Sequence, residues 1–219
     1  MQRHALLSAL LFHLLASVAS AQICFGDPSF SAGRVQLSGS ADFGQDAQSF
    51  GAGITLGSPT AFGGISVGAI SYDDLDGSTL VLGAGVGYQV PIATSGRVQL
   101  CPWLAGGLGF GPNDIEDTGI DASVRDVVFG VAVGGQLGPD AQVVVIPTAS
   151  LGFAYSSFKL DGPGGELEDS DTYALASLGA GLVFNSTFSI RPSVTIPFGL
   201  EDSDPTFGVS IAIHLGGSR

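Results

Sequence analysis

The chain has 219 residues and a formal net charge of −13, and only 12% of its residues are charged although its mean hydropathy is +0.42. A chain this acidic has no clustered Lys and Arg to meet a phosphate backbone, which argues against nucleic acid as a partner. Beyond the N-terminus no run of 18 apolar residues occurs, so helical membrane spans are excluded there. We therefore expect the apolar residues to alternate with other residues along strands, so that they gather on one face of each strand.

The first residues have the features of an export signal. A basic start and an apolar stretch within residues 3–18 precede Ala19-Ser20-Ala21, the small residues that signal peptidase needs. We expect residues 1–21 to be a signal peptide and residues 22–33 to form a periplasmic N-terminal segment. The alternative, a retained membrane anchor, is disfavoured because the apolar stretch is short for a spanning helix.

From residue 34 to residue 215 the chain consists of runs in which apolar and small residues alternate with a period of two. We predict ten strands, and most of them reach the roughly 9–11 residues that a tilted strand needs to cross a bilayer. The fold class is all-β, a closed antiparallel transmembrane up-and-down β-barrel, with eight strands as the alternative count. The predicted ranges are 34–43, 48–57, 61–72, 79–90, 97–110, 123–137, 141–157, 172–184, 187–199 and 206–215.

The two faces of these runs differ in a way that identifies their surroundings. In residues 206–215 one face carries Phe207, Val209, Ile211, Ile213 and Leu215, whereas the other carries Thr206, Gly208, Ser210, Ala212 and His214. A continuous apolar face suits lipid, and a face of small, mildly polar residues suits a confined lumen. A soluble lipocalin-like barrel, the alternative, would need many more charges on its wet face.

The connections between the predicted strands fall into two kinds. If both termini are periplasmic, the inner connections are short turns, whereas two of the outer ones, within residues 111–121 and 159–171, are long. Most acidic residues fall in the outer connections, within residues 73–76, 114–121, 161–171 and 201–204. Short periplasmic turns with longer extracellular loops are typical of outer-membrane barrels, so we expect an acidic outer rim.

Two cysteines, Cys24 and Cys101, lie at the predicted periplasmic level. In an exported chain they indicate one disulfide rather than a metal site, and two free thiols are the alternative. The bond would hold residues 22–33 across the periplasmic mouth as a partial plug. Trp103 and Arg191 are both predicted to face the lumen. They are the candidates to narrow the part of the lumen that the N-terminal segment leaves open.

One predicted strand carries a resemblance to a known family. Its residues Pro102-Trp103-Leu104-Ala105-Gly106-Gly107-Leu108-Gly109-Phe110 combine a proline, two aromatic residues and several glycines. They resemble a strand of the small outer-membrane barrels of the opacity type and the outer-membrane-protein-A type. The resemblance implies a bacterial outer-membrane barrel, surrounded by outer-membrane lipid and lipopolysaccharide and inserted by the barrel-assembly machinery.

Catalytic chemistry finds little support in the residues. Beyond the signal the only histidine is His214, at the periplasmic end and far from the acidic rim, so we expect no enzyme and no cofactor. A weak divalent-cation site at Asp73, Asp74 and Asp76 stays open, although the Ca²⁺-loop pattern is incomplete. We expect a structural or surface-interaction role in the cell envelope, and the alternative is a narrow, weakly cation-favouring pore for small solutes.

Overall fold

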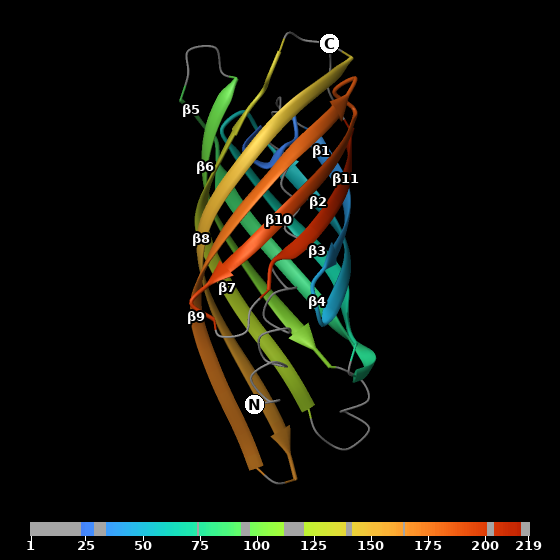
Figure 1. Ribbon diagram of the computed structural model, residues 1–219, viewed down its shortest axis with the longest axis vertical. Helices are drawn as coiled ribbons and strands as arrows, with labels where there is room; N and C mark the ends of the chain where they lie inside the picture. Colours follow the sequence, from blue (N-terminus) through green and yellow to red (C-terminus); the bar gives the residue numbers. More distant parts are fainter. Residues whose placement is uncertain are drawn as a thin grey trace.

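The computed structural model describes residues 23–28, 34–73, 75–92, 97–111, 121–138, 142–163, 165–200 and 204–215 (Figure 1). Among these residues, no helix is both long enough and apolar enough to cross a membrane. The elements are, in chain order, η1 (Ile23–Phe25), β1 (Arg34–Phe43), β2 (Ala47–Gly57), β3 (Ala61–Tyr72), β4 (Leu75–Tyr88), β5 (Val90–Pro91), β6 (Val98–Phe110), β7 (Asp121–Gly135), β8 (Val143–Gly162), β9 (Gly165–Phe184), β10 (Phe188–Phe198) and β11 (Thr206–Leu215).

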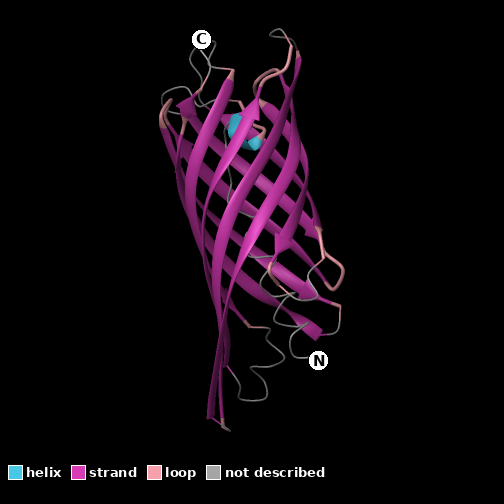
Figure 2. Ribbon diagram, turned by 60° about the vertical axis from the view of Figure 1, so that its left-hand side comes forward, coloured by secondary structure: helices cyan, strands magenta, loops and turns pink. Residues whose placement is uncertain are grey.

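All the strands lie in one antiparallel sheet that closes on itself. Strands adjacent in the chain pair with each other, β1 also pairs with β11, and β4 pairs with β6 across the short β5. Figure 2 shows these strands running obliquely around one barrel. The structure is thus the predicted closed ten-stranded up-and-down barrel with one extra short strand, β5.

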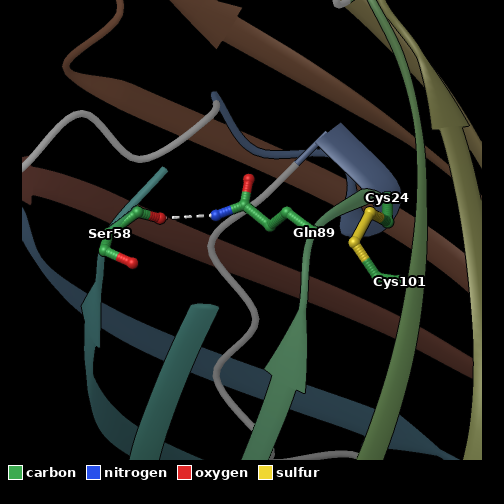
Figure 3. The surroundings of a disulfide bond; sticks show 4 residues. All are labelled: Cys24, Ser58, Gln89 and Cys101. Carbon is green, nitrogen blue, oxygen red and sulfur yellow. Dashed lines mark hydrogen bonds between the residues drawn. A yellow bond between two sulfur atoms is a disulfide. The ribbon is translucent and has the colours of Figure 1, made fainter. Parts of the chain in front are cut away.

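The extra strand arises from a break in the predicted strand 79–90. Gln89 leaves the regular ladder between β4 and β5, and its backbone N–H donates to the carbonyl oxygen of Thr60 at 2.8 Å. Its side-chain Nε2 donates to the carbonyl oxygen of Ser58 at 2.7 Å (Figure 3). Val90 and Pro91 then resume pairing with β6. These two bonds tie β4 to the β2–β3 turn at this end of the barrel.

The predicted outer connection at residues 159–171 is the main error in the strand assignment. Strands β8 and β9 continue through it as one long hairpin, in register from Val143↔Phe184 to Gly162↔Gly165. Lys159, which pairs with Glu168 in the ladder, reaches diagonally to Glu166, with Nζ and Oε1 3.1 Å apart. Most of the side chains between residues 159 and 171 are exposed or half-exposed. Because both faces of this segment meet water, its residues do not alternate in polarity, and the sequence looks like a loop. We call residues 156–172 the outer hairpin.

The barrel has two different ends. At one, the terminal end, β1 begins and β11 finishes; at the other, the hairpin end, β8 and β9 meet in the outer hairpin (Figure 1). Strands β1 and β11 are ten residues long, whereas β8 and β9 each have 20 residues. The wall is therefore much lower on the β1–β11 side than on the β8–β9 side at the hairpin end.

The outer face of the wall is apolar along the whole barrel. Ile65, Leu151 and Phe207 expose 66%, 68% and 64% of their surface, and they belong to three separate strands. Aromatic residues at the hairpin ends of strands, such as Phe43 and Phe110, are also exposed. A belt of exposed large apolar side chains flanked by aromatic residues is the surface that transmembrane barrels present to lipid.

The inner face carries small and polar residues with a few apolar clusters. The inward positions of β11, from Thr206 to His214, are buried or half-buried, as the alternation predicts. Toward the hairpin end, Ile70, Val81 and Val124 form a cluster inside the barrel. The inward face is therefore confined, and part of the lumen is filled by side chains from the wall itself.

The belt yields a prediction that separates a lipid-facing surface from a water-facing one. Leu151→Arg places a cation near the middle of β8 on the outer face and should destabilise the barrel in bilayers by about 2–4 kcal/mol. Leu167→Arg, in the outer hairpin and also half-exposed, is the matched control and should be almost neutral. Urea titration of protein refolded in lipid vesicles, followed by heat-modifiable gel mobility, measures both. Equal tolerance of the two substitutions would contradict a lipid-facing belt.

Candidate functional site in the barrel lumen

The terminal end of the lumen is occupied by the N-terminal segment of the chain. Residues 23–28, which we call the N-terminal plug, include η1. They lie inside the barrel, surrounded by its strands (Figure 2). Cys24 and Asp27 expose only 1% and 2% of their surface. Ile23 packs against Ile146 of β8 and Val183 of β9. Ile23, which belongs to the plug and not to the wall, thus completes the apolar core at this end of the lumen.

A disulfide attaches the plug to one side of the wall. Cys24 is bonded to Cys101 of β6, with their Cα atoms 6.1 Å apart, as the sequence predicts (Figure 3). Both cysteines pack with Ala132 of β7, and Phe25 and Trp103 flank them. The bond links residues 77 positions apart, so by the chain-entropy argument it stabilises the folded state by about 4.5 kcal/mol.

A buried polar cluster attaches the plug to the opposite side of the wall. We call it the Asp27 cluster, and it consists of Asp27, Gln36 of β1, Ser189 and Arg191 of β10, and His214 of β11. Arg191 Nη1 lies 3.5 Å from Asp27 Oδ2, and Gln36 Nε2 donates to the same oxygen at 3.4 Å. Ser189 Oγ donates to Asp27 Oδ1. The carboxylate is therefore bonded from strands β1 and β10, and His214 Nε2 of β11 lies 3.7 Å from its Oδ1.

Arg191 also holds the backbone of the plug. Its Nη1 donates to the carbonyl oxygen of Phe25, in addition to its ion pair with Asp27. Gly26 between these two residues has φ +86°, a left-handed conformation that favours glycine. The tight turn at Gly26 lets one guanidinium reach both the carbonyl before it and the carboxylate after it.

Two glycines of the wall make room for the plug. A Cβ atom on Gly134 of β7 would lie 1.8 Å from the carbonyl oxygen of Ile23, and one on Gly181 of β9 would lie 1.7 Å from that of Gly26. Real Cβ atoms do not approach backbone so closely. The plug backbone therefore rests directly on the inner surface of two strands, and any larger residue at either position would displace it.

The environment of Asp27 changes its proton affinity. Burial raises the pKa of the Asp27 carboxyl above its ordinary value of 3.8, because water no longer solvates the charge. Arg191 and the hydrogen bond from Ser189 act in the opposite direction and only partly offset the loss of solvation. The carboxyl thus binds a proton more tightly in the docked plug than in a released one.

Ser189, His214 and Asp27 are the residue types of a hydrolytic triad, but their arrangement does not match one. The same imidazole atom, His214 Nε2, lies 3.3 Å from Ser189 Oγ and 3.7 Å from Asp27 Oδ1, and the serine bonds the carboxylate directly. In a triad the acid orients the imidazole through its other nitrogen. Ser189 is also 1% exposed, so no substrate reaches it. The cluster therefore holds the plug and does not have the geometry of a triad.

The structure places the other predicted site residues as follows. Trp103 and Arg191 both line a cavity in the lumen, and their role in narrowing it stays a prediction. Asp74 and the side chain of Asp76 lie outside the described residues, and Asp73 is exposed. In the part of the chain that the structure describes, no three His, Cys, Asp or Glu side chains gather to hold a metal. The weak cation site at residues 73–76 stays a prediction.

Sequence reasoning did not find Asp27 or the two wall glycines. Asp27 is the only charged residue within residues 22–33, and an isolated acid in a segment predicted to enter a barrel needs a cationic partner. Arg191 and His214, both predicted inward near the same end, were available as that partner. Gly134 and Gly181 carry no comparable signal, since glycine is frequent on the whole inner face.

Closure of the sheet, its apolar outer belt and its confined inner face together define a transmembrane β-barrel of the outer-membrane type. No protein-family model matches the chain, and no curated protein matches it by sequence.

Several solved structures are similar to the chain in fold. The N-terminal β-barrel domain of Pseudomonas aeruginosa OprF is 14% identical, with 84% of this chain and 98% of that one covered and a TM-score of 0.37. Ail, the attachment invasion locus protein of Yersinia pestis, is 13% identical, with 84% and 100% covered and a TM-score of 0.42. Neisserial surface protein A is 8% identical, with 84% and 97% covered and a TM-score of 0.40.

The packing of the plug predicts that Gly134→Val prevents its docking. The new side chain would overlap Ile23, so Cys24 would not reach Cys101 and both thiols would become free. Because the chain has only two cysteines, maleimide labelling under non-reducing conditions counts them directly. Gly135→Val is the matched control, since a Cβ there meets its nearest neighbour at 3.5 Å. A disulfide that still forms fully in Gly134→Val would contradict the docked position.

The raised pKa of Asp27 predicts that plug docking weakens as the pH rises. A group that binds its proton more tightly in the docked state favours docking at low pH, and this advantage is lost as the pH rises from 3.8 through the raised value. In the Cys24→Ser variant only the Asp27 cluster holds the plug. We expect planar bilayers containing this variant to show conducting openings of the barrel more often at pH 8 than at pH 5. Adding Asp27→Asn to this variant should remove the pH dependence of opening. An unchanged pH dependence would contradict its assignment to the Asp27 carboxyl.

Proposed function

We propose that the chain is an integral outer-membrane β-barrel that is closed by its own N-terminal segment and has a structural or surface-interaction role in the cell envelope. The observation that carries the proposal is the plug itself. Cys24 and Asp27 are almost completely buried in the terminal end of the lumen, and they are fixed to opposite walls. A barrel built to conduct would have no need of a covalently attached plug.

The outer hairpin supports the surface-interaction part of the proposal. Glu166, Glu168 and Asp169 of β9 are exposed, and Lys159 is the one basic residue described in the outer hairpin. Strand β10 pairs with β9 only as far as Phe198↔Ala174, so within the described residues β9 has one partner strand, β8, between residues 165 and 173. The hairpin offers an acidic strand edge to the medium beyond the membrane, which suits partners with positive charge.

The proposal places the hairpin end outside the cell and both termini in the periplasm. The apolar belt then contacts outer-membrane lipid, and the acidic hairpin reaches the level of lipopolysaccharide, where divalent cations bridge anionic groups. Insertion by the barrel-assembly machinery and removal of residues 1–21, which lie outside the described residues, belong to the same proposal.

Orientation is tested by labelling intact cells with a membrane-impermeant maleimide. Ser170→Cys in the outer hairpin should be labelled from outside, because its side chain is exposed. Thr60→Cys, exposed in the β2–β3 turn at the terminal end, is the matched control and should react only after the outer membrane is permeabilised. The reverse pattern would overturn the orientation, and labelling of neither residue after permeabilisation would overturn their exposure.

Conductance separates the closed barrel from the alternative, a narrow pore. The oxidised wild-type protein should show no steady conductance in planar bilayers, because the plug fills the terminal end. The double variant Cys24→Ser, Gly134→Val loses both the disulfide and the space in which the plug docks, and it should conduct. Steady conductance of the oxidised wild-type protein would refute the closed barrel and favour the pore.

A further inference from the structure

Between the plug and the hairpin end, the lumen contains a cavity of about 160 Å³. One side of it is rich in hydroxyl groups, contributed by inward positions of β8, β9, β10 and β11. The hydroxyl-bearing residues that line it are Thr148, Ser150, Ser177, Ser193, Thr195 and Thr206. At about 30 Å³ for each water, the cavity has room for about five water molecules, or for one small ring with polar substituents.

The other side of the cavity is aromatic. Phe25 of the plug, Phe62 of β3 and Trp103 of β6 line it, and Phe25 lies edge-on to the other two with ring centroids 6.0 and 6.4 Å apart. Such contacts hold the three rings as one cluster. The cavity is therefore divided into an apolar wall and a hydroxyl-bearing wall that face each other across the lumen.

The two charged groups of the cavity are already engaged by the protein. Arg191 is bonded to Asp27 and to the carbonyl oxygen of Phe25. Asp42 is buried and accepts a hydrogen bond from Ser49 at 3.4 Å. A charged ligand would have to compete with these interactions, so the cavity suits a neutral one.

The indole of Trp103 packs against the wall of the barrel. Its Nε1 atom is buried and makes no hydrogen bond within the described part of the chain. The ring lies against Gly130 and Gly152, where added Cβ atoms would be 3.0 and 3.4 Å from it, so glycines on β7 and β8 give it room. Because Nε1 has almost no accessible surface, Trp103 presents apolar ring atoms to the cavity.

The position of the cavity makes it a blind pocket. The plug closes it at the terminal end through Cys24 and Phe25. Its lining extends to Asp42 and Thr206, which lie at the hairpin ends of β1 and β11, where the wall of the barrel is lowest. The pocket is therefore closed at the terminal end, and its other end lies toward the hairpin side.

We propose that this pocket binds a neutral, polyhydroxylated solute of about the size of a monosaccharide. The faces of such a ring carry C–H groups that pack on aromatic side chains, and its edges carry hydroxyls that exchange hydrogen bonds with serine and threonine. The Ser177–Thr195 pair, whose hydroxyl oxygens are 2.8 Å apart, binds one of the ligand's hydroxyl groups. The site is separate from the outer hairpin, so it does not rest on the proposed surface role.

Trp103 is the only tryptophan of the chain, so its fluorescence reports on this pocket directly. The full-length protein is refolded in lipid nanodiscs, because detergents with sugar headgroups would themselves be ligands. It is then titrated with neutral monosaccharides such as glucose and N-acetylglucosamine. We expect a saturable change with a dissociation constant on the order of millimolar, in keeping with the few atoms of the ligand. Cyclohexanol, a ring with one hydroxyl, and glucuronate, a charged sugar, should bind at least about fivefold more weakly.

Thr195→Val removes one hydroxyl at constant shape and should weaken binding at least about fivefold. Ser170→Ala in the outer hairpin removes a hydroxyl outside the pocket and should leave binding unchanged. If heat-modifiable mobility shows that Thr195→Val does not refold, Ser150→Ala is the second test of the same wall. A response that is linear in concentration, that is absent, or that is the same in the wall variants and the wild-type protein would mean that the pocket holds only solvent, and would overturn the proposal.

Discussion

The structure depends on one constraint, the pairing of every backbone N–H and C=O group within the wall. In lipid an unpaired group costs several kcal/mol, because no water is present to bond it. Pairing of β1 with β11 and of β4 with β6 removes the two edges that an open sheet would leave. Once the sheet is closed, each strand has one face toward lipid and one toward the lumen, and the alternation of the sequence follows from this.

Closure of a ten-stranded sheet also leaves space in the lumen, and the plug fills part of that space. An eight-stranded barrel is just filled by its own side chains, and ten strands enclose more space. At the hairpin end the wall supplies bulky residues such as Ile70 and Val124. At the terminal end the inner face is lined by small residues, among them Gly134 and Gly181, and the chain fills the space with residues 23–28. Small residues on the wall and a segment packed on them are two parts of one arrangement.

The plug is held by two attachments of different chemistry on opposite walls. The disulfide at Cys101 limits how far the segment can move, whereas the Asp27 cluster determines whether it is docked. An ion pair this deep has a large desolvation cost, and neighbouring hydrogen bonds are needed to offset it. Gln36 and Ser189 supply them. The same docking places Phe25 against Trp103 and so completes the aromatic wall of the luminal pocket.

The sequence alone determined the strands, because alternation with a period of two is a local consequence of the pleat. The predicted ranges 34–43 and 206–215 agree with β1 and β11, and the inward position of Trp103 follows from counting along one strand. The outer hairpin escaped prediction because strands that are wet on both faces do not alternate. Only the tertiary structure could assemble Asp27 with Arg191, since these residues are 164 positions apart and meet through closure of the barrel and docking of the plug. Local geometry is encoded residue by residue, whereas the luminal contacts exist only after the sheet has closed around the segment.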